Sequence, residues 1–362
     1  MRLSQNSLYF LLATGTVQAL SLNEVTSNVK RGTDAAVSNV KDAVHRLFAR
    51  QASAKENTCP KIWSQVASDL RDAFVSGGQC NDDARAAIRL VFHDCISGAG
   101  CDGSIILAGE YQRPENSGLE DIAVKVGNWA HQYNVGTADM IAFAAASGIS
   151  ACPGGPGINA LVGRKDSYTA APEGEIPSPK SSVTELLSQF AAKGFSATDM
   201  TALVGAHTAA KQRFVEPQKA GSPLDSTPGS WDTKFYSQTL DGSAPVSLDS
   251  DVNISRDDRT SGAFQRFQSI ATWSAAFVPA YVLPIPFFFF FFFFPFVLFT
   301  LDRIRAFNQD TDWFYCSMNR MTTIGNGGQN LVDCSSIIKS ATRGVNIKAA
   351  PLADRVRNSV QE

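Results

Sequence analysis

Apolar residues recur every three or four positions in several stretches of the chain, as expected for amphipathic helices. The clearest stretch spans residues 59–77 and ends at Gly77 and Gly78. Its apolar positions are Ile62, Trp63, Val66, Leu70, Ala73 and Phe74. An Ala-rich apolar stretch covers residues 137–150, and another covers residues 196–205, where Ser196 and Asp199 are suited to cap a helix. No run of alternating apolar and polar residues predicts a set of strands, so we expect a mainly α-helical fold with only short strands.

Residues 85–107 contain the first candidate chemistry, and their first half has helical character. On a helix, Arg89 and His93 are four positions apart and share a face. Phe92 lies on nearly the same side. A fixed cation beside an imidazole can take a proton from a small polar substrate and stabilise the charge that develops. The alternative interpretation is a buried helix with a hydrogen-bonded histidine.

A Gly-rich segment rich in oxygen ligands follows His93. Its carboxylates, hydroxyl and carbonyl belong to Asp94, Gly100, Asp102 and Ser104. These are the hard oxygen ligands that Ca²⁺ prefers, so we expect a first calcium site here.

The strings R-L-V-F-H-D-C and G-C-D-G-S together resemble the distal motif of the secreted haem peroxidases of the plant and fungal superfamily. This resemblance implies that Arg89 and His93 activate hydrogen peroxide above a haem iron, with Phe92 packed beside them. In fungal members an Asn accepts a hydrogen bond from the distal His and a Glu supports it, and Asn116 and Glu110 match these positions.

The resemblance extends to the other side of the haem. His207 and the following Thr208 match the proximal haem ligand and its neighbour, and Asp251 matches the Asp that accepts the ligand's N–H, with Asp249 as a nearby alternative. Pro177 matches a proline at the substrate edge of the haem. A second calcium site is implied at Thr208, Asp225, Thr227, the carbonyl of Ser230 and Asp232.

The fold implied by the resemblance has two lobes that enclose haem b. A distal lobe would span residues 51–180 and a proximal lobe residues 181–347. The resemblance also pairs six of the seven cysteines, as Cys59–Cys334, Cys80–Cys152 and Cys95–Cys101. Cys316 is left unpaired.

The ends of the chain indicate processing and secretion. Residues 1–19 resemble a signal peptide, with Arg2 before a short apolar run. Residues 20–50 are interpreted as a pro-segment, and an ordered helix over residues 35–47 is the alternative. Residues 348–362 are expected to form a C-terminal tail. The sequon Asn253-Ile254-Ser255 and the many cysteines also favour an oxidising, extracellular location.

One segment does not fit the family pattern. Residues 279–305 are surplus between Trp273-Phe277-Val278 and Phe314-Met318-Met321, and they include eight consecutive Phe at 287–294. The apolar run is long enough to span a bilayer, but prolines interrupt it. A translated intron is the favoured interpretation, and a genuine insertion or a membrane anchor are the alternatives.

The composition and net charge of the chain limit the kinds of partner that we expect. The chain has 362 residues, 44% of them hydrophobic, with a formal net charge of -2. This is enough for a large core, and the charge does not indicate nucleic acid or an anionic membrane as a partner. We expect a monomer that stays free of membranes unless the Phe-rich segment is real.

The resemblance also indicates which specialised activities to exclude. The manganese-binding positions of fungal relatives correspond to Asp82, Ala86 and Arg213, which would not hold Mn²⁺ well. The surface Trp of ligninolytic members corresponds to Ala202. The expected function is therefore a generic haem peroxidase that reduces hydrogen peroxide and oxidises phenolic or other small aromatic donors. The alternative is a non-catalytic or membrane-anchored haem-binding protein.

Overall fold

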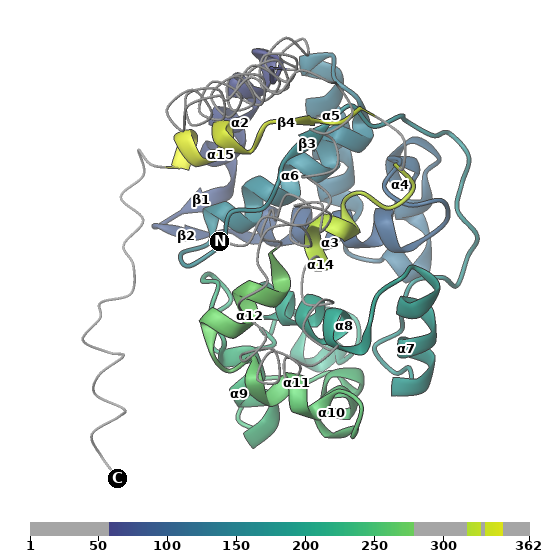
Figure 1. Ribbon diagram of the computed structural model, residues 1–362, viewed down its shortest axis with the longest axis vertical. Coiled ribbons are helices and arrows are strands. Elements are labelled where there is room, and N and C mark those ends of the chain that lie inside the picture. The colour runs from purple at the N-terminus through teal and green to yellow at the C-terminus, as the bar shows by residue number, and fades with distance from the viewer. Residues whose placement is uncertain (1–57, 279–316, 327–329, 343–362) are drawn as a thin grey trace, which may run out of the picture. The chain divides into compact units, whose positions relative to one another are not determined.

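The computed structural model describes residues 58–278, 317–326 and 330–342 (Figure 1). The expected signal peptide, pro-segment, Phe-rich surplus and C-terminal tail lie outside these residues, as do Phe314 and Cys316. The described residues all belong to one unit of the chain that begins at Thr58.

The described part of the chain is mainly α-helical, as predicted. Its α-helices are α2 (Ile62–Phe74), α3 (Asp82–Ile96), α4 (Ser104–Leu107), α5 (Glu120–Tyr133), α6 (Thr137–Ala151), α7 (Val183–Ala192), α8 (Ala197–Val204), α9 (Lys234–Asp241), α10 (Asp249–Arg256), α11 (Ser261–Arg266), α12 (Ile270–Phe277), α14 (Ser317–Met321) and α15 (Ser335–Thr342). Short 3₁₀ turns are η2 (Glu110–Gln112), η3 (Pro114–Asn116), η4 (Gly205–Ala209) and η5 (Pro217–Lys219). The described strands have two residues each: β1 (Val75–Ser76) pairs with β2 (Gln79–Cys80), and β3 (Leu161–Val162) with β4 (Val332–Asp333), both antiparallel.

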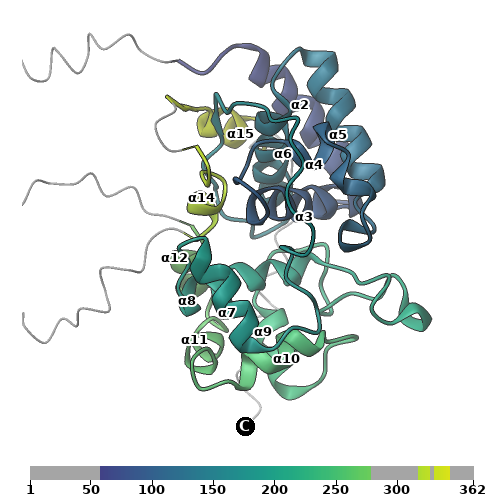
Figure 2. The ribbon, with the colours of Figure 1, turned by 90° about the vertical axis from the view of Figure 1, so that its right-hand side faces the viewer.

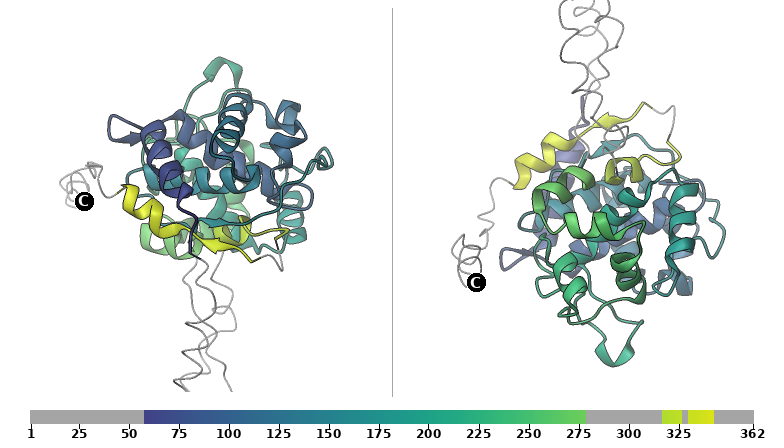
Figure 3. Two further views of the ribbon diagram at one scale, coloured as in Figure 1. Left: turned by 90° about the horizontal axis from the view of Figure 1, so that it is seen from above. Right: turned by 60° about the horizontal axis from the view of Figure 1, so that its bottom comes forward.

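Helix α6 forms the centre of the first group of helices. Nearly every residue of α6 is buried, which matches its continuous apolar sequence. Helices α2, α3, α5 and α15 pack against it, and Figure 3 shows α15 (yellow) alongside α2 (purple). The amphipathic pattern of residues 59–77 is confirmed as α2, which buries Trp63, Val66 and Leu70 and precedes the glycines of the β1–β2 turn.

Helices α7 to α12 form a second group (Figure 2), in which α8 contacts α7, α11 and α12. The predicted cap of α8 is confirmed, because Ser196 and Asp199 form a reciprocal capping box. Two buried aromatic side chains hold the end of α8: the Trp273 indole donates to Ala202 O at 2.9 Å and the Tyr236 hydroxyl to Thr201 O at 2.9 Å.

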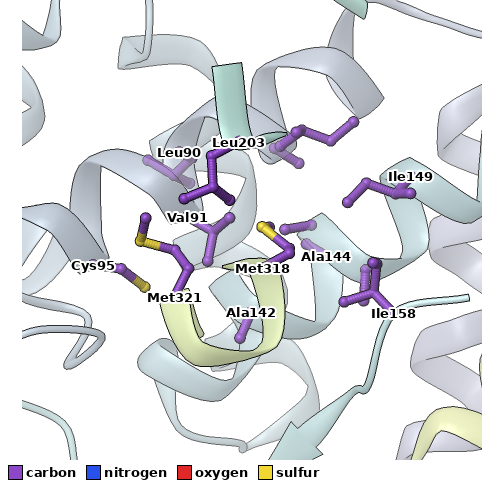
Figure 4. Close-up of a cluster of buried hydrophobic side chains, with 14 of the residues drawn as sticks. Leu90, Val91, Cys95, Ala142, Ala144, Ile149, Ile158, Leu203, Met318 and Met321 are labelled. Atoms are coloured by element: carbon purple, nitrogen blue, oxygen red, sulfur yellow. The ribbon is translucent and has the colours of Figure 1, made fainter. Parts of the chain in front are cut away.

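The segment around α14 joins these elements. Helix α14 contacts α3, α8 and α12, and the side chains of Met318 and Met321 are buried among residues such as Val91 and Leu203 (Figure 4). Because α12 and α14 are in contact, the chain on either side of residues 279–316 lies at one place in the fold.

Three disulfides join the cysteine pairs that the resemblance implied. They are Cys59–Cys334, Cys80–Cys152 and Cys95–Cys101. The first two close long loops and tie α2 to the segment before α15, and β2 to the end of α6. None of the described helices is long and apolar enough to cross a bilayer.

Candidate active site

Helix α3 brings Arg89 and His93 together on one face. Asn81 caps its N-terminus by accepting a hydrogen bond from Ala84 N. One turn apart, Arg89 Nε donates to His93 Nε2 at 3.1 Å, and Arg89 Nη1 donates to Ser117 O at 2.9 Å. His93 is buried, whereas Arg89 reaches the surface. The arrangement predicted from the spacing is therefore present.

Hydrogen bonds fix the tautomer of His93. Asn116 Nδ2 donates to Glu110 O at 2.8 Å, so Asn116 Oδ1 faces the imidazole and lies 2.7 Å from His93 Nδ1. Because Oδ1 can only accept, His93 Nδ1 carries the proton. Arginine can only donate, so His93 Nε2 is left as a base with a lone pair.

The surroundings of His93 keep it neutral. Burial and the nearby Arg89 charge lower the pKa of His93 to about 3, although the hydrogen bond to Asn116 opposes this. A neutral imidazole above this pH is ready to accept a proton over a wide range.

The second histidine, His207, lies in η4 directly after α8. The helical stretch expected over residues 196–205 is α8, which ends at Val204, three positions before His207. His207 Nδ1 lies 3.0 Å from Asp251 Oδ2 and 3.2 Å from Oδ1. Asp251 is buried and Asp249 is exposed, so Asp251 is the partner. Burial would lower the pKa of His207, but the Asp251 carboxylate offsets this and the pKa is raised.

The two histidines have one charged neighbour in common, Arg89. The Arg89 charge lowers the pKa of both His93 and His207, so it lies near each ring. The side chain of His207 is 34% exposed although its carboxylate partner is buried, and Nδ1 is the atom that faces Asp251, so Nε2 is the nitrogen left for a ligand. A neutral imidazole with its Nδ1–H held by a carboxylate is a suitable axial ligand for iron. These residues fit a haem bound at His207.

Aromatic side chains lie against both histidines. Phe92 stacks on Phe190 with ring centroids 6.0 Å apart, and Phe235 meets the His207 ring edge-on at 5.5 Å. Sequence reasoning found Phe92 but missed Phe190 and Phe235. Both come from helices distant in sequence from the ring that they contact, and no local motif marks them.

The residues of the first expected calcium site lie after α3. Asp94 accepts hydrogen bonds from Gly103 N at 3.1 Å and Ile105 N at 3.3 Å, and Asp102 Oδ1 accepts from Ser104 N at 3.0 Å. Burial, with the charge of Asp102 also contributing, raises the pKa of Asp94 to about 7. Two neighbouring carboxylates with a buried serine are a donor set that suits Ca²⁺. Gly100 lies in the same loop, between the paired Cys95 and Cys101.

The second expected calcium set is brought together more closely. Thr208 Oγ1 donates to Asp225 Oδ2 at 2.5 Å, and Thr227 Oγ1 donates to Asp232 Oδ2 at 2.8 Å. Ser230 follows in the same turn, where its N–H donates to Thr227 O at 2.9 Å. Burial and the charge of Asp232 raise the pKa of Asp225 to about 6.

Neither set is rich in charged ligands. Within the described residues, no three His, Cys, Asp or Glu side chains are grouped as a metal site. Each calcium ion would therefore depend on two carboxylates completed by hydroxyl and carbonyl oxygens, which Ca²⁺ accepts.

The structure adds detail for two of the expected site residues, Glu110 and Pro177, that the sequence did not specify. Glu110 supports Asn116 through its backbone carbonyl, while its carboxylate accepts from Ala171 N at 2.9 Å. Pro177 is half-buried in the segment between β3 and α7. Nearby in that segment, the Pro179 carbonyl accepts from Ser250 N at 2.9 Å and so connects it to α10.

A buried ion pair that the sequence analysis missed anchors this same segment. Arg164 Nη1 lies 3.1 Å from Asp139 Oδ1, and Arg164 Nε donates to Thr322 O at 3.1 Å. Asp139 also accepts from the backbone of residues 163 and 164, which holds the end of β3 against α6. The two charged residues are 25 positions apart in the sequence, so no local motif marks the pair.

Comparison with known proteins relates the chain to a family. The family model described as peroxidase matches residues 66–269. The chain is 29% identical to manganese peroxidase 3 of Phlebia radiata over 305 residues, which cover 75% of this chain and 74% of that protein. It is 32% identical to versatile peroxidase VPS1 of Pleurotus eryngii and 36% identical to a peroxidase of Arthromyces ramosus. These two alignments cover 52% of this chain and just over half of each relative, 55% and 56%.

Proposed function

The chain belongs to the peroxidase family, and on this premise we propose that it is a haem peroxidase that reduces hydrogen peroxide and oxidises phenolic or other small aromatic donors. The observation that carries the proposal is the presence of two histidines whose neighbouring side chains suit them to different roles. His93 is a neutral base beside a fixed cation, and His207 is an accessible imidazole backed by a carboxylate.

The cofactor would be haem b, held through His207 Nε2. When bound there, haem supplies a redox-active iron. Asp251 accepts the Nδ1–H of His207, which raises the electron density of the imidazole and its strength as a ligand. Phe235 holds the ring edge-on and limits its rotation.

His93 would move the proton that peroxide cleavage requires. Its Nε2 accepts a proton from one oxygen of H₂O₂ and returns it to the other oxygen, which departs as water. Arg89 stabilises the negative charge that develops on the departing oxygen. Asn116 holds the Nδ1 proton throughout, so Nε2 always presents the lone pair. In the full cycle, H₂O₂ gains two electrons and two protons to give two waters, and two donor molecules each lose one electron and one proton.

We assign the class of electron donor by excluding the specialised donors for which the chain lacks the expected residues. One relative is named a manganese peroxidase, but here Asp82 is paired with Arg85 and lies 3.2 Å from Lys211 Nζ. With Ala86 and Arg213 at the other two expected positions, a single compensated carboxylate would hold Mn²⁺ poorly. Ala202, at the position of the ligninolytic Trp, is fully buried. Small aromatic donors near the haem edge, in the region of Pro177, are the remaining choice.

We further propose a secreted, monomeric enzyme that contains two calcium ions. Three disulfides in a chain that begins with a signal-like segment favour an oxidising compartment. The calcium sets described above lie next to each histidine: Asp94 follows His93, and Thr208 follows His207.

The test compares three histidine variants of the haem-loaded protein. We expect His93→Ala to retain haem but to slow peroxide consumption by about 10²–10⁴-fold or more. His207→Ala should weaken haem retention or change the absorption spectrum of the iron. His131→Ala, in the exposed part of α5, is the matched control and should change neither.

The outcomes separate the two candidate functions. If the wild-type protein binds haem but consumes no peroxide with any donor, a non-catalytic haem-binding protein is the better account. If His93→Ala and His207→Ala behave alike, our assignment of their roles is wrong.

A further inference from the structure

A loop that follows His207 leaves apolar side chains on the surface. Residues 211–222 begin four positions after His207. Phe214 is 60% exposed and Val215 is 36% exposed, which places them among the exposed large apolar residues of the described chain. A single exposed apolar residue needs no explanation, but two adjacent ones raise the question of what they contact.

The loop is rigid because a buried amide closes it. Gln212 is buried and its Oε1 accepts from Glu216 N at 3.0 Å. Its Nε2 donates to Glu216 O at 3.0 Å and to Lys219 O at 2.5 Å. The Gln212 backbone also pairs with Ser222 O and Gly221 N. Phe214 and Val215 therefore project from a fixed backbone, so a ligand that binds there loses little free energy to ordering the loop.

Phe214 lies next to Arg89. A Cβ atom added to Gly118 would lie 2.9 Å from Phe214 Cε2 and 3.5 Å from Arg89 Nη1. The ring and the guanidinium therefore border the same glycine, which leaves room for both. Because Arg89 Nε contacts His93 Nε2, the Phe214 ring lies close to the acid–base pair.

The charges around Phe214 favour anions. Asp82 is shared by two cations, Arg85 and Lys211, which leaves positive charge in excess. Arg213 is exposed directly beside Phe214 and adds a further positive charge.

The remaining charges nearby cancel in pairs. Glu216 pairs with Lys219 at 2.8 Å. Glu120 accepts from Gly118 N and offsets the charge of Arg89. The excess at the edge of the loop is therefore cationic.

We propose that Phe214 and Val215, with Lys211 and Arg213, form a docking surface that selects anionic aromatic donors, namely phenols that carry a carboxylate. This inference deepens the proposed function and rests on it. The ring of the donor packs on Phe214, and its carboxylate turns toward the two cations. The phenol hydroxyl then points toward the site of oxidation.

The experiment uses two donors of the same shape and different charge. 3-(4-Hydroxyphenyl)propionate is an anion at neutral pH, and 3-(4-hydroxyphenyl)propanamide is its neutral counterpart. With the haem-loaded full-length protein, Phe214→Ala should raise KM for both donors by about 3- to 10-fold, the size of one aromatic contact. Phe214→Leu should have a smaller effect because it keeps apolar area. Lys211→Gln and Arg213→Gln should each raise KM about 2- to 5-fold for the anion only, as for an exposed ion pair.

A binding measurement and a control make the result independent of turnover. Calorimetric titration with the redox-inert 3-phenylpropionate should show the same losses of affinity in the same variants. Tyr168→Ala, which removes another exposed aromatic side chain, should leave KM and binding as in the wild type.

Two failures can be told apart. If both donors are oxidised and substitution of Phe214, Lys211 or Arg213 leaves KM unchanged, the docking surface is refuted and the proposed peroxidase function stands. If no donor is oxidised, the proposed function fails, and the calorimetric titration then decides alone whether the surface binds aromatic anions.

Discussion

Replacing Arg89 by Leu should change the pH dependence of the reaction with peroxide in a predictable direction. We expect protonation of His93 to set the acid limit of the reaction, and its pKa is lowered to about 3 by burial first and by the Arg89 charge second. Arg89 Nε lies 3.1 Å from His93 Nε2. Two unit charges about 4 Å apart interact by about 4 kcal/mol at an effective dielectric constant of about 20, which corresponds to about 3 pKa units.

The expected shift is smaller than this limit. The Arg89 charge is spread over the guanidinium and its side chain reaches solvent, so screening reduces the interaction. We expect the acid limb of Arg89→Leu about 1 to 2 pH units higher than in the wild type. It should stay below 6.5, because burial of His93 remains. The plateau rate should fall by about 10²–10³-fold, since a group that stabilises developing charge is lost.

The assay is stopped-flow mixing with H₂O₂ from pH 3 to 8, with haem content verified in each variant. Arg89→Lys is the control: it keeps a cation, so its acid limb should stay close to that of the wild type. The reasoning is refuted if Arg89→Leu leaves the acid limb in place or moves it downward. In that case His93 would not be the titrating base, or Arg89 would not set its pKa.

The same pKa affects stability in a defined pH window. The folded state holds His93 neutral down to about pH 3, while the unfolded chain takes up a proton near pH 6.5. Between these values the unfolded state binds more protons, so stability rises with pH. The contribution of His93 is fully present above about pH 6.5 and is lost as the pH falls toward 3. Melting temperatures of His93→Gln should therefore depend less on pH across this window than those of the wild type.

Three further outcomes are expected. Chelation of calcium should lower the melting temperature and the peroxidase rate together. In Asp225→Asn the second calcium site is already weakened, so chelation should lower both quantities less than in the wild type. Unchanged activity after verified calcium removal would contradict this prediction. Deletion of residues 279–305 should raise the soluble yield and keep turnover, and a deletion protein that binds haem less well than the full chain would show that the segment belongs to the fold. Asp139→Asn should lower the free energy of unfolding by about 3–5 kcal/mol because it leaves the buried cation of Arg164 unpaired, and urea denaturation of this variant beside exposed Asp72→Asn measures the difference.

The features predicted best from the sequence were those formed by residues of a single helix or helix cap. Arg89 and His93 share a helix turn, and Ser196 and Asp199 share a cap, so spacing alone determined their relation. The 3₁₀ turn η4 that follows α8 was not predicted. A Cβ on Gly205 would lie 2.2 Å from the Tyr236 hydroxyl, so the chain after Val204 is shaped by a residue 31 positions later.

Contacts between distant segments required information that no local pattern contains. Phe190 stacks on Phe92 from almost 100 residues away, and Arg164 reaches both α6 and the carbonyl of Thr322. Asp251 was chosen over Asp249 by resemblance, and its burial against His207 gives the physical reason. The docking surface around Phe214 was missed because its meaning depends on Gly118, which lies on another element.

The buried core also indicates why residues 279–305 look foreign. Trp273 and Phe277 are buried at the end of α12, and Met318 and Met321 are buried in α14. Helices α12 and α14 contact each other directly. These four buried side chains therefore belong to helices that already pack against each other, which is the physical basis of the deletion experiment.

The surroundings of His93 and His207 share two features, which link the proposed calcium sites to the proposed roles of the two histidines. Each ring has its Nδ1 held by a buried oxygen, from Asn116 for His93 and from Asp251 for His207. Each is also followed by a residue of an expected calcium set, Asp94 or Thr208. With the two proposed calcium ions bound, the backbone that positions each imidazole would be fixed from two directions. Loss of an ion would release one of them, so the proton carrier and the expected iron ligand should lose their alignment before the helices that carry them unfold.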